Sequence, residues 1–157
     1  MAEELTISAG SKEEKYRELV PQIRSVVECE TDVIANMANV ASMLHETFGF
    51  WWTGFYRVAE GVLVLGPFQG KTACTRIPMG KGVCGTAALS GQIQVVPDVH
   101  QFPGHIACDS ASNSEIVIPL HKDGAVAAVL DIDSPEFDRF QEADRAGLER
   151  LVRLLEH

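Results

Sequence analysis

Hydrophobic residues recur every three or four positions near both ends of the chain, which is the spacing of amphipathic helices. Ser11 and Glu14 form a capping-box pattern at the start of the first such segment, and Pro21 is expected to kink or divide the helix behind it. A second helical segment is expected to end at Gly49, because glycine readily adopts the left-handed conformation that closes helices. The last amphipathic helix is expected over residues 140–155.

Between these helices the chain has short runs of β-branched and aromatic residues, which predict strands. The predicted strands are 51–58, 62–65, 75–77, 93–96, 114–120 and 125–132. The hairpin signal Asp123-Gly124 joins the last two, and a short helix is expected over 83–89. Segments 66–73 and 98–113 are expected to be loops, and a loop as long as the second is usually functional. The predicted fold class is α+β, with a mainly antiparallel sheet and the N- and C-terminal helices packed on one face.

Length, charge and cysteine usage narrow the class of protein. The chain has 157 residues, 46% of them hydrophobic, which fits one folded domain. The net charge of −9 argues against nucleic acid and anionic membrane as partners, because phosphate binding needs clustered Lys and Arg. There is no apolar run near the ~20 residues of a membrane span, and no signal-peptide pattern at the start. We therefore expect a cytoplasmic protein, in which the four cysteines are not a structural disulfide framework.

Residues 80–85 read Gly-Lys-Gly-Val-Cys-Gly and match the G-x-G-x-x-G pattern of dinucleotide-binding loops. That function requires a leading strand within a βαβ unit, whereas here Pro78 precedes the glycines. The favoured interpretation is that the glycines allow a tight turn into the short helix.

Three of the four cysteines lie where thiol chemistry is plausible. Cys84 lies near the N-terminus of the short helix, where partial positive charge can stabilise a thiolate. Cys74 has basic residues nearby in sequence, and Cys108 lies in the long loop, where a cysteine packs poorly. Cys29 has no chemical neighbours and is interpreted as structural. From the residues alone, Cys108 cannot be ranked above Cys84 as a nucleophile.

A zinc site is an alternative use of the same loop. His100, His105 and Cys108, together with Cys84 or Cys74, would supply the nitrogen and sulfur ligands that zinc prefers. There is no closely spaced ligand pair to define the geometry, and two loop histidines are more often solvated. We therefore predict no metal.

Carboxylates are expected to gather at one end of the sheet. Asp131 and Asp133 are two apart at the end of a predicted strand, so they share a face. Glu115 opens the preceding strand of the same hairpin, at nearly the same level. Like charges this close raise at least one pKa, which suits a proton donor or a cation site. The alternative is a solvated strand end.

Aromatic residues open the first predicted strand. Trp51 and Trp52 face opposite sides of that strand, so one is expected in the core and the other beside a pocket. Tyr56 shares the face of Trp52. The alternative is that all three are core residues.

These features together resemble the free methionine-(R)-sulfoxide reductases, which are stand-alone GAF domains. The segments that carry the resemblance are 16–21, 49–56, 66–70, 80–86, 97–99, 102–108, 112–115 and 130–135. The most specific are the Gly-His-Ile-Ala-Cys segment that ends at Cys108 and the Leu-Asp-Ile-Asp-Ser-Pro segment over 130–135. The resemblance spans nearly the whole chain and implies a single GAF domain over 1–157, with a six-stranded antiparallel sheet and a pocket under loops.

The resemblance also implies roles for individual residues and partners. Cys108 would attack the sulfoxide, Cys74 would resolve the product as a disulfide, and Cys84 would have a secondary role. The family's substrate-binding and proton-donating residues would be Trp52, Tyr56, Glu115, Asp131 and Asp133. The implied partners are free methionine-(R)-sulfoxide and thioredoxin, with a homodimer as the expected assembly and no bound cofactor.

Two other functions stay open at this point. The first is a GAF module that senses a small molecule such as a cyclic nucleotide, because fold alone does not settle function. Such a sensor usually carries an output domain, and a phosphate ligand fits poorly beside three carboxylates. The second is a zinc-binding regulatory protein.

Overall fold

Over residues 4–8, 10–106, 108 and 110–157, which the computed structural model describes, helices and strands follow the predicted α+β order. The elements are α1 (Lys12–Val27), α2 (Val33–Phe48), β1 (Trp52–Ala59), β2 (Val62–Gln69), β3 (Arg76–Pro78), α3 (Gly82–Ser90), β4 (Gln94–Val96), the 3-10 turn η1 (Val99–Gln101), β5 (Ser114–Lys122), β6 (Ala125–Ser134) and α4 (Glu142–Leu154). None of these helices has the length and apolar composition needed to cross a membrane.

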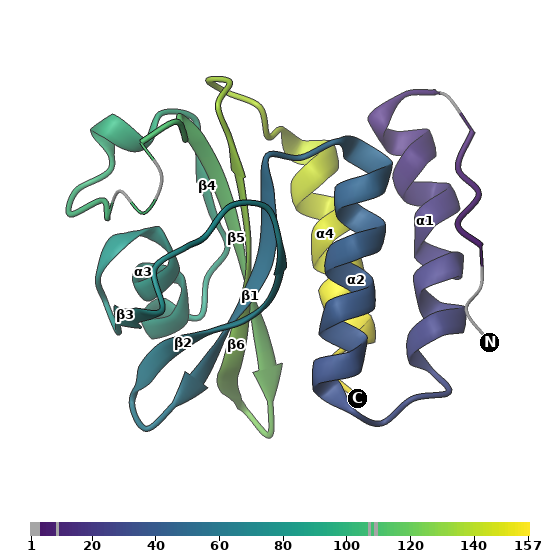
Figure 1. The fold of residues 1–157 in the computed structure, drawn as a ribbon, viewed down its shortest axis with the longest axis horizontal. Coiled ribbons are helices and arrows are strands. Elements are labelled where there is room, and N and C mark those ends of the chain that lie inside the picture. Colours follow the sequence, from purple (N-terminus) through teal and green to yellow (C-terminus); the bar gives the residue numbers. More distant parts are fainter. Residues whose placement is uncertain (1–3, 9, 107, 109) are drawn as a thin grey trace.

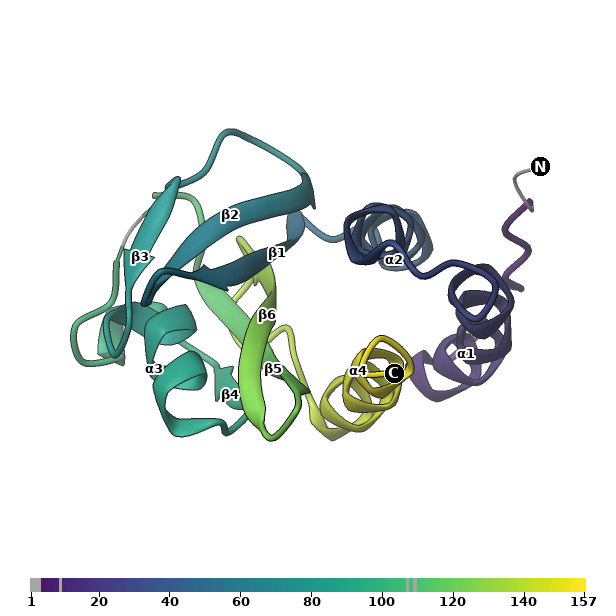
Figure 2. The same cartoon turned by 90° about the horizontal axis from the view of Figure 1, so that it is seen from below.

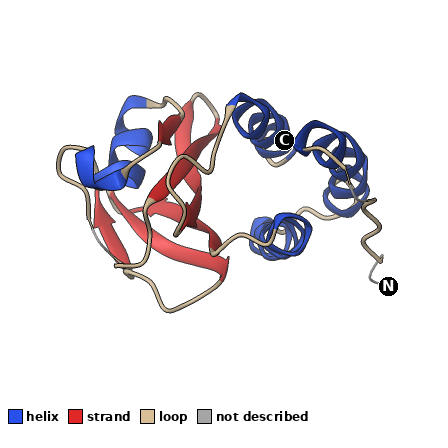
Figure 3. Cartoon of the chain, turned by 90° about the horizontal axis from the view of Figure 1, so that it is seen from above, coloured by secondary structure: helices blue, strands red, loops and turns tan. Residues whose placement is uncertain are grey.

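One sheet of six strands divides the described part of the molecule, in the order β3-β2-β1-β6-β5-β4 with every pair antiparallel. Helices α1, α2 and α4 lie on one side of the sheet, and α3 lies on the other (Figures 1 and 2). Figure 3 shows the same layers by secondary structure, with red strands between the two groups of blue helices. The predicted sheet, with helices from both ends of the chain on one face, is confirmed.

Successive residues of a strand point to opposite faces, so each central strand contributes to two cores. In β1, Phe55 packs on the side of the three long helices, whereas Trp52 and Tyr56 pack on the α3 side. In β6, Leu130 and Ile132 belong to the helix side. Buried polar residues of the sheet occur on both sides: Thr53 contacts His45 of α2 (3.1 Å), whereas Glu115 and Asp131 line a cavity on the α3 side.

Strand β2 is longer than predicted, because it continues to Gln69 where a loop was expected from residue 66. The pairing with β1 shifts between Gly54 and Tyr56, so that Leu65 pairs with Tyr56 but Phe68 pairs with Gly54. A β-bulge of this kind accommodates the glycine and proline at 66 and 67, which would otherwise interrupt a regular ladder. The loop prediction over 66–69 is therefore wrong.

Helix α1 runs without division from Lys12 to Val27 although it contains Pro21. Pro21 and Arg17 are both exposed. Pro21 has no N–H, so the carbonyl of Arg17 lacks its usual helical hydrogen-bond donor. This carbonyl lies on the solvent side of the helix, where water can donate a hydrogen bond to it. Gly49 ends α2 in the left-handed conformation (φ 62°), as predicted.

Helix α4 begins two residues later than predicted, because its first turn is organised around the fully buried Asp144. The Asp144 carboxylate accepts hydrogen bonds from the Gln141 backbone N–H (2.9 Å) and the Tyr16 hydroxyl (2.8 Å). Lys12 Nζ lies 2.6 Å from the same carboxylate. Phe140, the predicted first residue, is instead a buried core residue before the helix.

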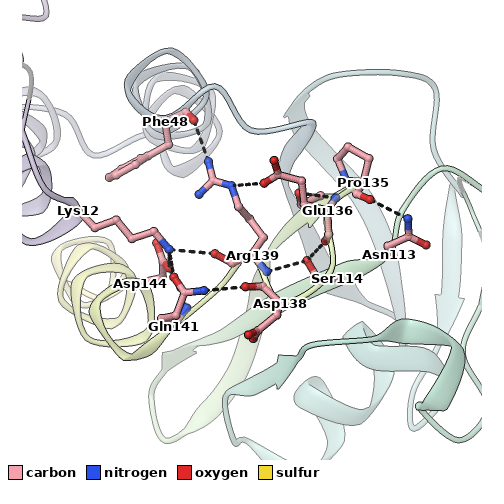
Figure 4. Close-up of polar contacts among 11 residues, drawn as sticks. Lys12, Phe48, Asn113, Ser114, Pro135, Glu136, Asp138, Arg139, Gln141 and Asp144 are labelled. Carbon is pink, nitrogen blue, oxygen red and sulfur yellow. Dashed lines mark hydrogen bonds and ion pairs between the residues drawn. The ribbon is translucent and has the colours of Figure 1, made fainter.

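The connection from β6 to α4 holds the start of β5 against the helices (Figure 4). The Ser114 hydroxyl donates to the Glu136 carbonyl (2.6 Å), and the Arg139 backbone N–H donates to the Ser114 hydroxyl oxygen (3.3 Å). The Arg139 guanidinium donates to the Phe48 carbonyl at the end of α2 (3.1 Å), and Lys12 Nζ donates to the Arg139 carbonyl (2.9 Å). Contacts to α1, α2 and β5 thus fix the position of the first residues of β5.

Candidate active site

The hairpin of β5 and β6 brings three carboxylates to the α3 face of the sheet. Glu115 pairs with Asp133 across the two strands, and Val117 pairs with Asp131. Residues two apart on a strand share a face, so the three carboxylates lie side by side. Glu115 and Asp131 are buried and Asp133 is half-buried. The predicted convergence is confirmed, and the alternative of a solvated strand end is wrong for the two buried residues.

A cavity lies over these carboxylates, between the sheet, α3 and the loops that carry two of the cysteines. The predicted site residues that line it are Trp52, Tyr56, Cys84, Cys108, Glu115, Asp131 and Asp133. Cys74 does not itself line the cavity, but its neighbour Ala73 does. One recess thus collects residues from four strands (β1, β3, β5 and β6), from the start of α3 and from two loops.

Two aromatic residues of β1 form one wall of the cavity and hold the neighbouring loop. The rings of Trp52 and Tyr56 lie 6.0 Å apart and are stacked. The Trp52 indole N–H donates to the Lys71 carbonyl (2.9 Å), and the Tyr56 hydroxyl donates to the Cys74 carbonyl (2.8 Å). These two side chains therefore fix the backbone on which Cys74 is carried. Trp51 is half-buried, and its ring lies under the Lys71 ammonium instead (4.8 Å).

Cys74 and Cys108 are joined by a disulfide, with their Cα atoms 5.4 Å apart. Both residues are half-buried. Cys74 directly follows the predicted loop 66–73, and Cys108 lies within the predicted loop 98–113. The disulfide joins these two segments beside the cavity. Because a disulfide sulfur has no free thiolate to offer, neither cysteine can serve in the zinc site considered above while the bond exists.

The glycine-rich segment places Cys84 in the cavity. Gly82 has φ +62°, a left-handed conformation, and a Cβ at Gly85 would lie 2.5 Å from the Pro78 carbonyl oxygen. The glycines thus serve a tight turn into α3, and the three-residue edge strand before them is not part of a βαβ unit. The structural interpretation of this motif is confirmed. The Cys84 thiol is buried and donates to Glu115 Oε2 (3.9 Å).

The electrostatics of the cavity favour protonated groups. Burial, with the nearby charges of Asp131 and Asp133, raises the pKa of Glu115 well above its usual range. Burial also raises the pKa of Asp131. A carboxylic acid that stays neutral in a cavity is a proton donor.

The same surroundings change the interpretation of Cys84. Burial, and then the charges of Asp131 and Glu115, raise the pKa of the Cys84 thiol well above its usual value. The expectation that the N-terminus of the short helix makes Cys84 a thiolate is therefore wrong, because desolvation and the carboxylates outweigh the helix dipole. Cys84 is a neutral thiol in this fold.

His105 is a cavity residue that sequence reasoning considered only as a zinc ligand or a solvated side chain. Burial lowers the pKa of its imidazole, which keeps the ring neutral near pH 7. His100, by contrast, is exposed and its Nε2 contacts Asn113 Oδ1 (3.0 Å). The position of His105 within the specific Gly-His-Ile-Ala-Cys segment was the available signal.

Other lining residues also went unpredicted as site residues. They are Thr72, Ala73, Ile77, Lys81, Gly82, Val83, Ile106 and Ser112. Most lie within two or three residues of a cysteine in the sequence, so proximity to Cys74, Cys84 and Cys108 was the signal that could have found them.

Glu115→Gln is expected to raise the melting temperature more at pH 8 than at pH 5. Between the ordinary value of 4.5 and the raised pKa, folded Glu115 holds a proton that the unfolded chain has lost. The free energy of unfolding of the wild type therefore falls as pH rises through this window, a loss that Gln avoids. Each kcal/mol gained shifts the melting temperature by about 2–4 °C in a domain of this size. The exposed Glu46→Gln is the matched control, and an equal shift for both variants at both pH values would contradict the prediction.

Comparison with known proteins identifies the family. Residues 32–157 match the family described as "GAF domain". Over the whole of both chains, the protein is 53% identical to GAF domain-containing protein A of Dictyostelium discoideum.

Two further relatives have a named activity. The chain is 50% identical to the free methionine-R-sulfoxide reductase of Escherichia coli, covering 93% of this chain and 89% of that protein. The solved structure of free methionine-R-sulfoxide reductase from Neisseria meningitidis, in complex with its substrate, is 52% identical with a TM-score of 0.95, covering 98% of this chain and 93% of that one. The chain therefore belongs to the free methionine-R-sulfoxide reductase family, GAF-domain enzymes that are oxidoreductases.

Proposed function

We propose that this chain reduces free methionine-(R)-sulfoxide to methionine, with Cys108 as the attacking thiol and Cys74 as the resolving thiol. The observation that carries the proposal is the placement of the Cys74–Cys108 pair at a cavity with three converging carboxylates. Relatives named for this activity, one of them solved with its substrate, support it.

In the first step the Cys108 thiolate attacks the sulfoxide sulfur, and the sulfoxide oxygen passes to the cysteine. The sulfoxide is reduced by two electrons to the thioether of methionine, and Cys108 is oxidised to a sulfenic acid. Cys74 then attacks the sulfenic sulfur, which forms the disulfide and releases the oxygen as water. A Cα separation of 5.4 Å is compatible with this bond.

The oxygen that leaves the substrate sulfur must be protonated, and Glu115 is the proposed donor. It is buried and lines the cavity, and its raised pKa favours the protonated form that a proton donor requires. Asp131 and Asp133 lie beside it and would receive the substrate's ammonium group, whose positive charge compensates theirs. Trp52 and Tyr56 would flank the apolar part of the substrate.

The substrate preference is expected to be strict. Free methionine-(R)-sulfoxide should be reduced, whereas the S diastereomer, N-acetylmethionine sulfoxide and peptide-bound methionine sulfoxide should not. Acylation removes the positive charge that Asp131 and Asp133 would bind, and leaves their negative charges without a partner. Methionine release from each compound, measured with pre-reduced enzyme, tests this. Equal rates for the free and the N-acetylated R sulfoxide would rule out the ammonium assignment.

The remaining requirements of the cycle are external to the cavity. We expect thioredoxin to reduce the Cys74–Cys108 disulfide by thiol exchange, with no cofactor bound to the chain. We also expect a homodimer that works in the cytoplasm. Thioredoxin-coupled NADPH oxidation that depends on the sulfoxide tests the enzyme against a GAF module that only senses a small molecule, which would consume none.

A further inference from the structure

Cys84 has no step in the proposed reaction, although it lies in the same cavity as the carboxylates. The residue is 4% exposed, and its Sγ lies 3.9 Å from Glu115 Oε2. Among the described residues, Cys84, Glu115 and Asp131 each offer one ligand atom, and these three atoms lie within 4.8 Å of one another. One thiol and two carboxylates therefore face a common point in a buried recess.

Asp131 provides an independent sign that a ligand belongs there. Its side chain lines the cavity and is 5% exposed, and its Oδ1 has no hydrogen-bond partner among the residues that the structure describes. Burying an oxygen that has no hydrogen-bond partner costs free energy. A hydrogen-bond donor or a cation that binds this oxygen removes that cost. An ammonium group would satisfy the oxygen but would gain little from the Cys84 sulfur, whereas a thiophilic metal ion uses all three groups.

We propose that Zn²⁺ binds in this cavity through Cys84 Sγ and one oxygen each of Glu115 and Asp131. In tetrahedral zinc sites the bond lengths of thiolate and carboxylate ligands place sulfur and oxygen about 3.6 Å apart. The observed Sγ–Oε2 separation of 3.9 Å needs only a small adjustment. Coordination exchanges the thiol proton for the metal ion, and water completes the fourth position.

The ligand set also predicts which cations are rejected. Mg²⁺ requires a near-octahedral shell of oxygens, so a site with one sulfur and two carboxylates should discriminate against it. This set differs from the zinc site considered from the sequence, since His100 lies elsewhere and the Cys108 sulfur is held in the disulfide. The set of Cys84, Glu115 and Asp131 does not use Cys74 or Cys108, so all three ligands are present while those two cysteines form the disulfide.

Zinc would occupy the position of the substrate's ammonium group, because both use Asp131. We therefore expect Zn²⁺ to be a reversible inhibitor that competes with free methionine-(R)-sulfoxide. This competition rests on the proposed function, whereas the binding of zinc itself does not.

The experiment is calorimetric titration of the tag-free, oxidised chain with ZnCl₂ and, separately, with MgCl₂. Oxidation removes Cys74 and Cys108 as ligands, so that Cys84 and the exposed Cys29 are the remaining thiols. We expect one Zn²⁺ per chain and no binding of Mg²⁺. Cys84→Ser and Asp131→Asn should each weaken zinc binding by more than about tenfold, the least that loss of even an outer partner costs. Cys29→Ser is the control and should bind zinc like the wild type.

Cobalt reports the metal–sulfur bond directly, and in the wild type this readout requires no variant. Co²⁺ bound to the oxidised wild type should show the ligand-to-metal charge-transfer absorption of a cobalt–thiolate bond, retained in Cys29→Ser and lost in Cys84→Ser. The metal site is overturned by absence of one-to-one zinc binding to the wild type, by unchanged affinity in both Cys84→Ser and Asp131→Asn, or by absence of the thiolate band. Zinc binding that methionine sulfoxide fails to displace would leave the site standing and overturn the competition.

Discussion

Cys108→Ser is expected to abolish the release of methionine from free methionine-(R)-sulfoxide, even in a single turnover of pre-reduced enzyme. A serine hydroxyl at this position is a far weaker nucleophile than a thiolate and cannot carry the oxygen as a sulfenic acid. The other thiol of the cavity does not replace it, because burial and the neighbouring carboxylates raise the pKa of Cys84. Rapid mixing with one equivalent of substrate, followed by quantification of methionine, measures the loss.

Cys74→Ser separates the two chemical steps. We expect it to release one methionine per chain and then stop, because the Cys108 sulfenic acid has no partner with which to form the disulfide. Trapping of the sulfenic acid with a selective reagent and mass spectrometry should locate it at Cys108, and thioredoxin-driven cycling should be lost. Cys29→Ser, in which an exposed cysteine is replaced, should behave like the wild type. A first turnover that survives in Cys108→Ser but not in Cys84→Ser would show that the nucleophile was assigned wrongly.

Glu115→Gln is expected to lower the rate of the chemical step by roughly 10²–10⁴-fold, the usual contribution of a general acid. Glutamine keeps the shape and hydrogen-bonding capacity of the side chain but cannot release a proton at the required acidity. Single-turnover rates at saturating substrate isolate this step from binding and from thioredoxin. The rate of the wild type should also fall as pH rises through the raised pKa of Glu115, because the acid form is lost. The variant should lack this limb of the pH profile.

Asp131→Asn and Asp133→Asn provide the contrast within the same cavity. Each removes a negative charge next to the expected ammonium position, so we expect weaker substrate binding with a smaller effect on the chemical step. The comparison of saturating and subsaturating single-turnover rates distinguishes the two effects. Near-wild-type kinetics in all three carboxylate variants would exclude this end of the sheet from the reaction.

The two groups of predictions test different parts of the site. Cys74 and Cys108 lie outside the strands and helices, and their disulfide must be reduced before the Cys108 thiol can attack the substrate. The carboxylates belong to the paired strands β5 and β6. The start of β5 is attached to α1 and α2 through the connection shown in Figure 4. The cysteine variants therefore test the loop segments, and the carboxylate variants test the sheet.

Local patterns were enough to predict much of this arrangement. The alternation in β5 and β6 and the Asp123-Gly124 turn predicted that Glu115, Asp131 and Asp133 gather at one end of the sheet, but the pairing of Glu115 with Asp133 also depends on a one-residue register shift between Leu120 and His121. Period-two spacing also placed Trp52 and Tyr56 on one face. Such predictions succeed because side-chain direction along a strand depends on neighbours within a few residues.

Other features depend on partners that the local sequence does not reveal. The extension of β2 is decided by a bulge against β1, and the position of His105 by how a long loop folds over the sheet. The helix start near Cys84 indicated a thiolate, but its pKa is determined by burial and by Glu115 and Asp131, which follow it by more than thirty residues in the sequence. The sequence by itself thus determined which residues share a strand face or end a helix. Only the tertiary structure decided which groups lose water and which charges meet, because desolvation and Coulomb interactions depend on distance in space.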